Sequence, residues 1–257
     1  MQTEFTDSVA LITGSSRGVG RATARYLAQR GAKVVINYRN TPEQARSLAE
    51  EIGDLGTEAL VIRADLEDPD QIDAMFDQIH EHFGKLDIFV ANAASTAFKD
   101  LIDVKPHHLH RTFAITLDAF VQGVQRAASL MDRGRIVAVS GLDAHRYLPK
   151  HGVLGAAKSA LETLVGYWAC ELGPQGITVN GVCPGLIASD SGTFYADVMG
   201  IGWQTLHDRY AEQTPLRRIA TPEDIAKVIG FFCSQGAAMI TGQTLVVDGG
   251  LMVVNPA

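Results

Sequence analysis

Short apolar runs alternate with longer amphipathic segments along almost the whole chain, and this alternation limits the possible fold more than any other feature of the sequence. The runs are nearly free of polar residues, as in Val9–Thr13 and Leu86–Ala91. Parallel strands covered on both faces are apolar in this way, and the connections between them are usually helices of about ten or more residues. The sequence therefore predicts an α/β fold, a doubly wound parallel sheet of about seven strands with helices on both faces.

The same pattern places the individual elements. Strands are expected at Val9–Thr13, Lys33–Asn37, Ala59–Ala64, Leu86–Ala91, Arg135–Ser140, Thr178–Val182 and Thr244–Val247. Helices are expected at Val19–Gln29, Pro42–Leu55, Pro69–Phe83, Lys105–Met131, Gly152–Leu172 and Pro222–Ser234. No linker rich in proline and serine divides the chain, so residues 1–257 are expected to form one domain.

The least typical stretch is Ser189–Thr214, late in the chain. It follows Pro184-Gly185 and is rich in apolar and aromatic residues, including Phe194 and Trp203. Ligands of open α/β sheets bind at the carboxyl ends of the strands. We therefore interpret residues 189–214 as a substrate lid, with a plain packed pair of helices as the alternative.

Charge and apolar content exclude several classes of partner. The net charge is −7, and Lys and Arg are interspersed with Asp and Glu without a basic run. Nucleic acid and an anionic membrane surface are therefore not expected as main partners. No apolar run approaches the length of a membrane span, and the N-terminus enters a strand without room for a signal peptide. The three widely separated cysteines fit a reducing compartment, so a cytoplasmic location is expected.

A glycine-rich loop joins the first expected strand to the first expected helix, at residues 13–20 with the sequence TGSSRGVG. Glycines let the backbone approach a pyrophosphate, and a helix N-terminus offers free amides and the positive end of its dipole. A glycine loop alone is a weak signal. Its position within the first strand–helix–strand unit makes it a strong indication of a dinucleotide site.

Other polar residues follow the later strands in a fixed order. Asp65 comes after the third expected strand, Asn92 after the fourth, and Lys158 within the helix after the fifth. Near the end of the chain, residues 241–250 read TGQTLVVDGG. Together with the glycine loop, this set resembles the short-chain dehydrogenase/reductase superfamily over the whole chain. The resemblance implies a Rossmann-type domain that binds a nicotinamide dinucleotide.

The resemblance also implies which residues contact the dinucleotide. They are Gly14, Ser16, Arg17, Gly18, Val19, Gly20, Arg39, Asp65, Leu66, Asn92, Ala93, Lys158, Pro184, Gly185, Ile187 and Ser189. Lys158 is implied to hold the hydroxyls of the nicotinamide ribose, and Asp65 to border the adenine. An alternative role for Asp65 is to cap the helix that begins at Pro69.

The end of the second expected strand indicates which nicotinamide cofactor is bound. An NAD-selective site places a carboxylate there to accept hydrogen bonds from the adenine ribose, but this strand ends in residues 37–40, NYRN. Arg39, with Arg17 of the glycine loop, is suited to pair with a 2′-phosphate. NADPH is therefore the expected cofactor, and the alternative is that both arginines are solvated surface residues.

The superfamily's catalytic tetrad of Asn, Ser, Tyr and Lys is mostly absent. The Tyr position holds Leu154, which can neither donate nor accept a proton. The Asn position is assigned to Thr116 and the Ser position to Gly141, so only Lys158 remains. The usual reduction of a ketone to an alcohol is therefore not expected from these positions.

A narrower resemblance lies in residues 146–158, RYLPKHGVLGAAK. Enoyl-thioester reductases of the same superfamily place their acid seven residues before the lysine, where this chain has His151 in place of that family's tyrosine. The resemblance implies reduction of an enoyl group carried on coenzyme A or on a carrier protein. His151 is the first candidate for the proton donor; Tyr147, Ser140 and the ribose hydroxyl held by Lys158 are the others.

Other functions stay open from the sequence. A ketoreductase could use a proton donor relocated to Tyr147 or His151, and a homologue without redox activity could bind NADP(H) in a regulatory role. Asp143 and His145 are a further candidate acid–base pair.

Two other features concern metals and assembly. No metal site is expected, because the cluster of His107, His108 and His110 has no cysteine or acidic partner at ligand spacing. The superfamily resemblance implies a homodimer or homotetramer that pairs through the helices after the fourth and fifth strands.

Overall fold

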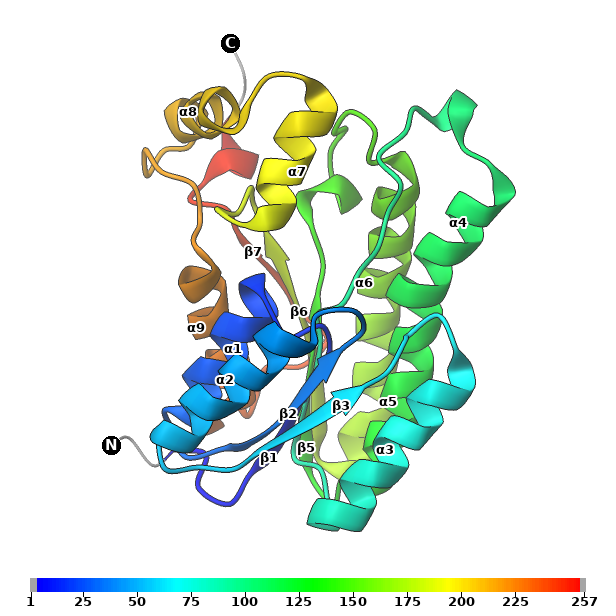
Figure 1. Ribbon diagram of the computed structural model, residues 1–257, viewed down its shortest axis with the longest axis vertical. Helices are drawn as coiled ribbons and strands as arrows, with labels where there is room; N and C mark the ends of the chain where they lie inside the picture. The colour runs from blue at the N-terminus through cyan, green and yellow to red at the C-terminus, as the bar shows by residue number, and fades with distance from the viewer. Residues whose placement is uncertain (1–3, 255–257) are drawn as a thin grey trace.

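One parallel sheet forms the centre of the molecule. The computed structural model describes residues 4–254, and in this part of the chain seven strands lie in the order β3-β2-β1-β4-β5-β6-β7 (Figure 1). The strands are β1 (Val9–Ile12), β2 (Lys33–Tyr38), β3 (Ala59–Arg63), β4 (Ile88–Ala91), β5 (Gly134–Val139), β6 (Ile177–Pro184) and β7 (Thr244–Val247). All neighbouring strands are parallel. The predicted doubly wound, Rossmann-type α/β fold is confirmed.

Helices cover both faces of the sheet, as predicted. One face packs against α1 (Gly18–Ala28), α2 (Pro42–Asp54) and α9 (Pro222–Cys233), and the other against α3 (Pro69–Phe83), α5 (Ala119–Leu130) and α6 (Gly152–Leu172). The strand order reverses between β1 and β4, and in such sheets this switch point is where ligands bind. Within residues 4–254, no helix has the length and apolar character needed to cross a membrane.

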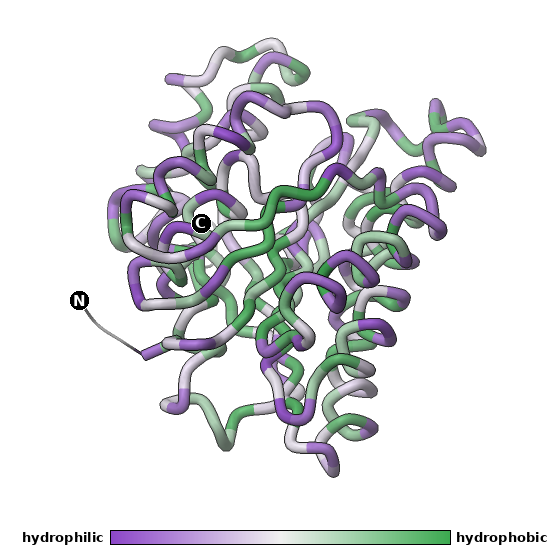
Figure 2. Tube along the Cα trace, turned by 60° about the horizontal axis from the view of Figure 1, so that its bottom comes forward, coloured by the Kyte–Doolittle hydropathy of each residue, from purple (hydrophilic) through white to green (hydrophobic). Residues whose placement is uncertain are grey.

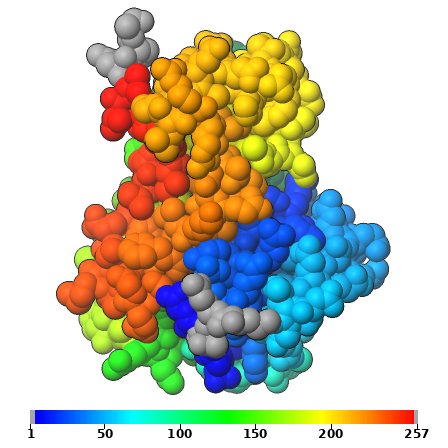
Figure 3. Space-filling model, turned by 90° about the vertical axis from the view of Figure 1, so that its left-hand side faces the viewer, coloured from blue at the N-terminus to red at the C-terminus, as the bar shows by residue number. Residues whose placement is uncertain are grey.

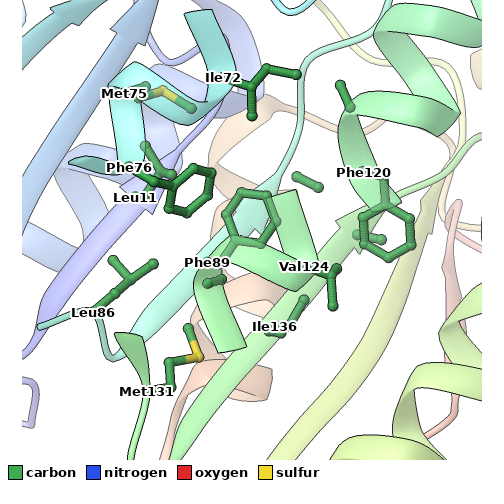
Figure 4. Close-up of a cluster of buried hydrophobic side chains, with 14 of the residues drawn as sticks. Leu11, Ile72, Met75, Phe76, Leu86, Phe89, Phe120, Val124, Met131 and Ile136 are labelled. Atoms are coloured by element: carbon green, nitrogen blue, oxygen red, sulfur yellow. The ribbon is translucent and has the colours of Figure 1, made fainter. Parts of the chain in front are cut away.

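The hydrophobic core fills the space between the sheet and each helical layer. Between the sheet and α3, the rings of Phe76 and Phe89 meet edge to face with their centroids 5.9 Å apart (Figure 4). Such a pair contributes about 0.5–1.5 kcal/mol beyond the burial of its area. The central strands are mostly apolar, whereas hydrophilic residues are frequent on the outer helices and loops (Figure 2). This packing fixes the positions of the strands' carboxyl ends, where the predicted site residues lie.

The helix predicted over Lys105–Met131 is interrupted. It consists of α4 (Pro106–Phe113), a π turn at Ala114–Asp118 and α5. A π turn inserts an extra residue into the helical repeat and is frequent at functional sites. Here the turn contains Thr116, whose side chain is buried at the position assigned to the tetrad's asparagine.

Residues 189–214 fold into two helices, α7 (Asp190–Met199) and α8 (Trp203–Gln213). They lie at one end of the molecule, beyond the carboxyl ends of the strands (Figures 1 and 3). Tyr195 and Leu206 form the centre of a small apolar cluster between them, and Phe98 from the loop after β4 packs against it. The segment is thus a packed pair of helices placed next to the switch point, and its role as a lid stays a prediction.

Candidate active site

The glycine loop after β1 has the conformation and the space that a bound phosphate requires. Gly14 and Gly18 have positive φ angles of 62° and 55°, which residues with side chains rarely adopt. A Cβ atom on Gly20 would lie 2.6 Å from the carbonyl oxygen of Gly14 and 2.7 Å from Nδ2 of Asn92. Glycine at position 20 therefore allows α1 to start directly against the end of β4.

Side chains from neighbouring strands hold this loop in place. Asn92, after β4, donates from Nδ2 to the carbonyl oxygen of Thr13 at 2.8 Å. The Thr13 hydroxyl accepts from the amides of Asn92 and Ala93 at 3.0 and 3.1 Å. At the end of β2, Oδ1 of Asn37 accepts from the Gly14 amide at 3.1 Å. The loop is thus preorganised by the fold itself.

The start of α1 fits an anionic group. The helix begins at Gly18 after Arg17, and among residues 4–254 no side chain caps its first turn and no acidic side chain lies in it. Its first amides and the positive end of its dipole are therefore available to a diphosphate. The preceding Ser16 hydroxyl is fixed by a hydrogen bond from Thr41 Oγ1 at 2.7 Å. These residues fit the pyrophosphate of a dinucleotide.

Arg39 and Asp65 face each other across the ends of β2 and β3. Nη1 of Arg39 lies 3.6 Å from Oδ1 of Asp65, with the two side chains 35% and 32% exposed. Asp65 also accepts a hydrogen bond from the Glu67 amide at 3.1 Å. It does not cap α3, because Asp68 occupies that position. A guanidinium has five donors, so Arg39 keeps donors for a phosphate in addition to this ion pair.

The remaining residues implied to contact the dinucleotide lie close to the same edge of the sheet. They are Val19, Leu66, Pro184, Gly185, Ile187 and Ser189. Ile187 forms a parallel bridge with Ala220, and the Ser189 hydroxyl caps α7 by accepting from the Gly192 amide at 3.4 Å. The fold therefore brings the whole set to one edge, while their individual contacts with the dinucleotide stay predictions.

Lys158 is buried in α6 beside the end of β5. Its side chain is only 4% exposed, and Nζ donates to the carbonyl oxygen of Val139. Burial lowers the pKa of Lys158 to about 8, although Asp143, among other acidic groups, opposes this shift. The ammonium group is thus positioned by the strand end, as the role of holding ribose hydroxyls requires. Leu154 lies one turn earlier on the same helix and is half-buried.

A carboxyl group fills the space beside Gly141. Asp143 lies in a short turn, η3 (Leu142–Ala144), and its Oδ1 atom is 2.5 Å from the point that a Cβ atom on Gly141 would occupy. The backbone carbonyl oxygen of Asp143 occupies the space that a side chain on Gly155 of α6 would need. Its Oδ2 atom is buried and has no hydrogen-bond partner among the described residues.

The surroundings of Asp143 favour its neutral form. Burial raises the pKa of this carboxyl group above its ordinary value of 3.8, because a buried carboxylate loses its hydration. The nearby positive charges of Lys158 and His151 act in the opposite direction, and Glu162 adds to the rise. Burial is the largest of these effects.

Ser140 and His145 share a carboxylate partner, Glu162 of α6. The Ser140 hydroxyl donates to Oε1 of Glu162, and Nε2 of His145 lies 2.9 Å from Oε2. His145 was expected to pair with Asp143, but in the structure it pairs with Glu162. Ser140 is 4% exposed, so its hydroxyl is engaged within the fold.

Three potential metal ligands meet behind this group. The donor atoms of His145, Glu162 and Cys183 lie within 4.8 Å of one another. Glu162 already has two hydrogen-bond partners, and burial raises the pKa of the Cys183 thiol to about 12. The Glu162 carboxylate is therefore held by its own neighbours, Ser140 and His145, within the described part of the chain.

His151 immediately precedes α6 and lies between two aromatic rings, one of them from α7. Its ring centroid is 4.5 Å from that of Tyr195 and 4.8 Å from that of Phe98, both edge to face. Nδ1 is 3.0 Å from the carbonyl oxygen of Pro149, so a proton on Nδ1 is donated there and Nε2 is left for another partner. Tyr147, by contrast, is 84% exposed, so His151 is much better enclosed for contact with a substrate.

Sequence reasoning missed two residues of this region and gave a third, Asp143, a different partner. Phe98 and Tyr195 enclose His151. Asp143, expected to pair with His145, lies close enough to Lys158 and His151 for their charges to act on the pKa of its carboxyl group. No motif marks Phe98, and Tyr195 was visible only as part of an aromatic segment. For Asp143, the available signal was the glycine two residues before it, at the position of the tetrad's serine.

Comparison with known proteins identifies the family of the chain. Residues 14–252 match the family model described as enoyl-(acyl carrier protein) reductase. The chain is 45% identical over 257 residues to 1-cyclohexenylcarbonyl-CoA reductase of Streptomyces collinus, covering 99% of this chain and 90% of that protein. It is 38% identical over 249 residues to versicolorin reductase stcU of Emericella nidulans, covering 94% of each.

A solved structure shows the same fold. A short-chain dehydrogenase from Burkholderia cenocepacia J2315, in complex with NADP, matches with a TM-score of 0.90 at 32% sequence identity. The match covers 97% of this chain and 99% of the other. The arrangement of strands and helices is therefore shared over nearly the full length of both chains.

Proposed function

The chain belongs to the short-chain dehydrogenase/reductase superfamily of oxidoreductases, in the family described as enoyl-(acyl carrier protein) reductase, and on this premise we propose that it reduces the carbon–carbon double bond of an enoyl-thioester with NADPH. One observation carries the proposal. The site has Gly141 and Leu154 in place of the serine and tyrosine hydroxyls, yet keeps Lys158 and a preorganised glycine loop. The groups for ketone reduction are missing while those for the dinucleotide are present.

The choice of NADPH rests on charge at the end of β2. Arg39 stands where an NAD-selective site has a carboxylate, and Arg17 lies exposed in the glycine loop. Asp65 balances Arg39 without using all of its donors, so a 2′-phosphate fits beside the guanidinium. The similar Burkholderia protein was solved with NADP, which agrees with this choice.

An enoyl group on coenzyme A or on a carrier protein is the proposed substrate. The Streptomyces collinus relative is named for the reduction of a cyclohexenylcarbonyl-CoA. In this chain, Leu154 lies one helical turn before Lys158, and the rings of Phe98 and Tyr195 give the region around His151 an apolar lining. Such a lining suits an acyl chain or ring and keeps water away from it.

The chain's own residues provide what this reaction needs. Bound NADPH supplies the hydride that reduces the β-carbon of the enoyl group. Lys158 holds the ribose hydroxyls, and the negative charge that develops on the thioester oxygen needs a hydrogen-bond donor, which is worth about 3 kcal/mol. We assign this donor to the protonated form of His151, in which Nδ1 donates to the Pro149 carbonyl oxygen and the proton on Nε2 is left for the substrate.

A ketoreductase is the second candidate. The observation that favours it is the likeness to the reductase LugOII, whose structure is described as catalysing a keto-reduction and matches at 32% identity with a TM-score of 0.88. Ketone reduction would also need a proton donor. His151 is better enclosed for that role than Tyr147, which lies at the surface.

Substrate assays distinguish the two candidates. NADPH oxidation is measured with crotonyl-CoA and 1-cyclohexenylcarbonyl-CoA, and separately with a β-ketoacyl-CoA and simple ketones. Turnover of the enoyl-CoA substrates, with the saturated acyl-CoA found by mass spectrometry, is the expected result. Consumption of ketones alone would establish the second candidate, and NADPH binding without any turnover would point to a non-redox role.

We also propose that the chain assembles as a homodimer or homotetramer through α4–α5 and α6. Tyr167 of α6 is 65% exposed, an apolar contact suited to a partner helix. Sedimentation velocity tests this directly, and a monomer at micromolar concentration would contradict it.

A further inference from the structure

We propose that Asp143 is the proton donor of this site, and that its carboxyl group has taken over the place of the superfamily's serine. The inference rests on the proposed reduction of an enoyl-thioester and assigns the proton that this reaction consumes. His151 then polarises the thioester oxygen, and Asp143 delivers the proton to carbon.

The placement of the carboxyl group is the first argument. Its Oδ1 atom lies 2.5 Å from the point that a Cβ atom at position 141 would occupy. It therefore fills the space of a side chain at the position that the superfamily resemblance assigns to the tetrad's serine. Gly155 removes a second side chain that would collide with the Asp143 backbone. Glycines at 141 and 155 together make room for an aspartate in this turn.

The lack of a partner is the second argument. Oδ2 of Asp143 is buried, yet no described residue hydrogen-bonds to it. A buried polar atom without a partner is costly, and in native proteins it usually has a ligand or a functional role. The neighbouring acid Glu162 is different, because Ser140 and His145 occupy its two oxygens. Of these two partly buried acids, Asp143 alone has an oxygen without a hydrogen-bond partner among the described residues.

The charges around Asp143 suit an acid that is regenerated in each cycle. Lys158 and His151 are the positive groups that face it, and Glu162 and the Cys183 thiol are the acidic groups nearby. Burial raises the pKa of the Asp143 carboxyl group and so favours its protonated form. Once the proton has left, the Lys158 ammonium stabilises the carboxylate.

The chemical step balances as follows. A hydride from NADPH forms a C–H bond at the β-carbon, NADPH becomes NADP⁺, and the π electrons of the double bond form an enolate. The α-carbon takes the proton from Asp143, the O–H bond breaks, and the carboxylate is reprotonated from solvent. In sum, the enoyl-thioester, NADPH and one proton give the acyl-thioester and NADP⁺.

Asp143→Asn tests the role through activity. It keeps the size of the side chain but cannot release a proton, so we expect kcat with crotonyl-CoA to fall by about 10²-fold or more, with the NADPH Kd within threefold of wild type. Wild-type kcat should fall as the pH rises through the pKa of Asp143, and this alkaline limb should be missing in the variant. Asp143→Glu should recover part of the activity, and Asp132→Asn, on an exposed loop, serves as the charge-matched control.

A spectroscopic readout tests the role without turnover. The ¹³C resonance of the Asp143 carboxyl is assigned by its absence in Asp143→Asn. It should show that the group is still protonated at pH values above the ordinary aspartate pKa of about 4. A carboxyl that ionises near pH 4, an Asp143→Asn kcat within threefold of wild type, or an unchanged alkaline limb each overturns the inference.

Failure of the proposed function is distinguishable from failure of this inference. Wild-type protein that reduces ketones but no enoyl-CoA refutes the proposed substrate. Ketone reduction also consumes a proton, so the Asp143→Asn comparison is then made with the ketone. Protein without any turnover overturns both.

Discussion

The Oδ1 atom of Asp143 lies 2.5 Å from the point where a Cβ atom on Gly141 would be, so the residues at these two positions depend on each other. Gly141→Ala should force the carboxyl group to move and lower the free energy of unfolding by about 1–3 kcal/mol, the usual cost of overpacking. In an Asp143→Ala background the same substitution should cost much less. Urea unfolding of the two single variants and the double variant measures this coupling. Additive effects would show that the two side chains do not compete for one space.

His151→Phe separates hydrogen bonding from packing against α7. The phenyl ring can keep the edge-to-face contacts with Phe98 and Tyr195, but it has no donor for the thioester oxygen. We expect kcat with an enoyl-CoA to fall at least tenfold, because one hydrogen-bond donor to a developing oxyanion usually contributes at least that much to kcat. The affinity for NADPH should change little. Tyr147→Phe, at an 84% exposed position, is the matched control. Equal kcat values for the two variants would remove His151 from the mechanism.

The fold was predictable because its signals are local, whereas much of the catalytic region was not. Buried strands such as β6 read directly as apolar runs, and the glycine loop has a sequence signature of its own. The position of Asp143 depends on how a short turn folds over Gly141 and against α6, which no spacing encodes. The pairing of His145 with Glu162 depends on packing in the same way.

Helical periodicity also hid the interruption at Ala114–Asp118. These residues continue the apolar pattern of the flanking helices, so the sequence predicted one helix across Lys105–Met131. The π turn changes the phase of the helix by one residue and places Thr116 in the interior, where its hydroxyl has no partner among the described residues. Choosing between α and π geometry requires knowledge of what the helix packs against.

Arg39→Ala should reveal which cofactor the site selects. If the guanidinium pairs with a 2′-phosphate, its removal should weaken the binding of NADPH by about tenfold or more, which corresponds to the loss of one charge-assisted hydrogen bond. The binding of NADH should stay nearly unchanged. Fluorescence titration with both cofactors measures this. Arg46→Ala, which removes an exposed arginine paired with Glu43 on α2, is the control. An equal loss for NADPH and NADH would contradict the assignment of NADPH.

The start of α9 should stabilise the fold in a pH-dependent way. Asp224 accepts from the Thr221 amide at 3.0 Å and pairs with Arg218 at 2.5 Å, next to the bridge between Ile187 and Ala220 that holds the segment after β6. The hydrogen bond from Arg218 lowers the pKa of Asp224 well below its usual range. A lowered folded-state pKa contributes stability above the unfolded-state value near 4, and this contribution is lost as the pH falls toward the folded-state value.

Asp224→Asn should therefore lower the free energy of unfolding by about 1–2 kcal/mol at pH 7. The difference from wild type should shrink as the pH is lowered from about 5 toward 2, because the wild-type carboxylate is then progressively protonated. Glu223→Gln removes an acid from the same helical turn whose nearest cation, Arg25, is 3.7 Å away, and it should change stability by less than about 0.5 kcal/mol. Urea unfolding across this pH range checks both variants. A constant difference between wild type and Asp224→Asn would mean that the ion pair with Arg218 does not lower the acid's pKa, and that the helix cap acts through hydrogen bonding alone.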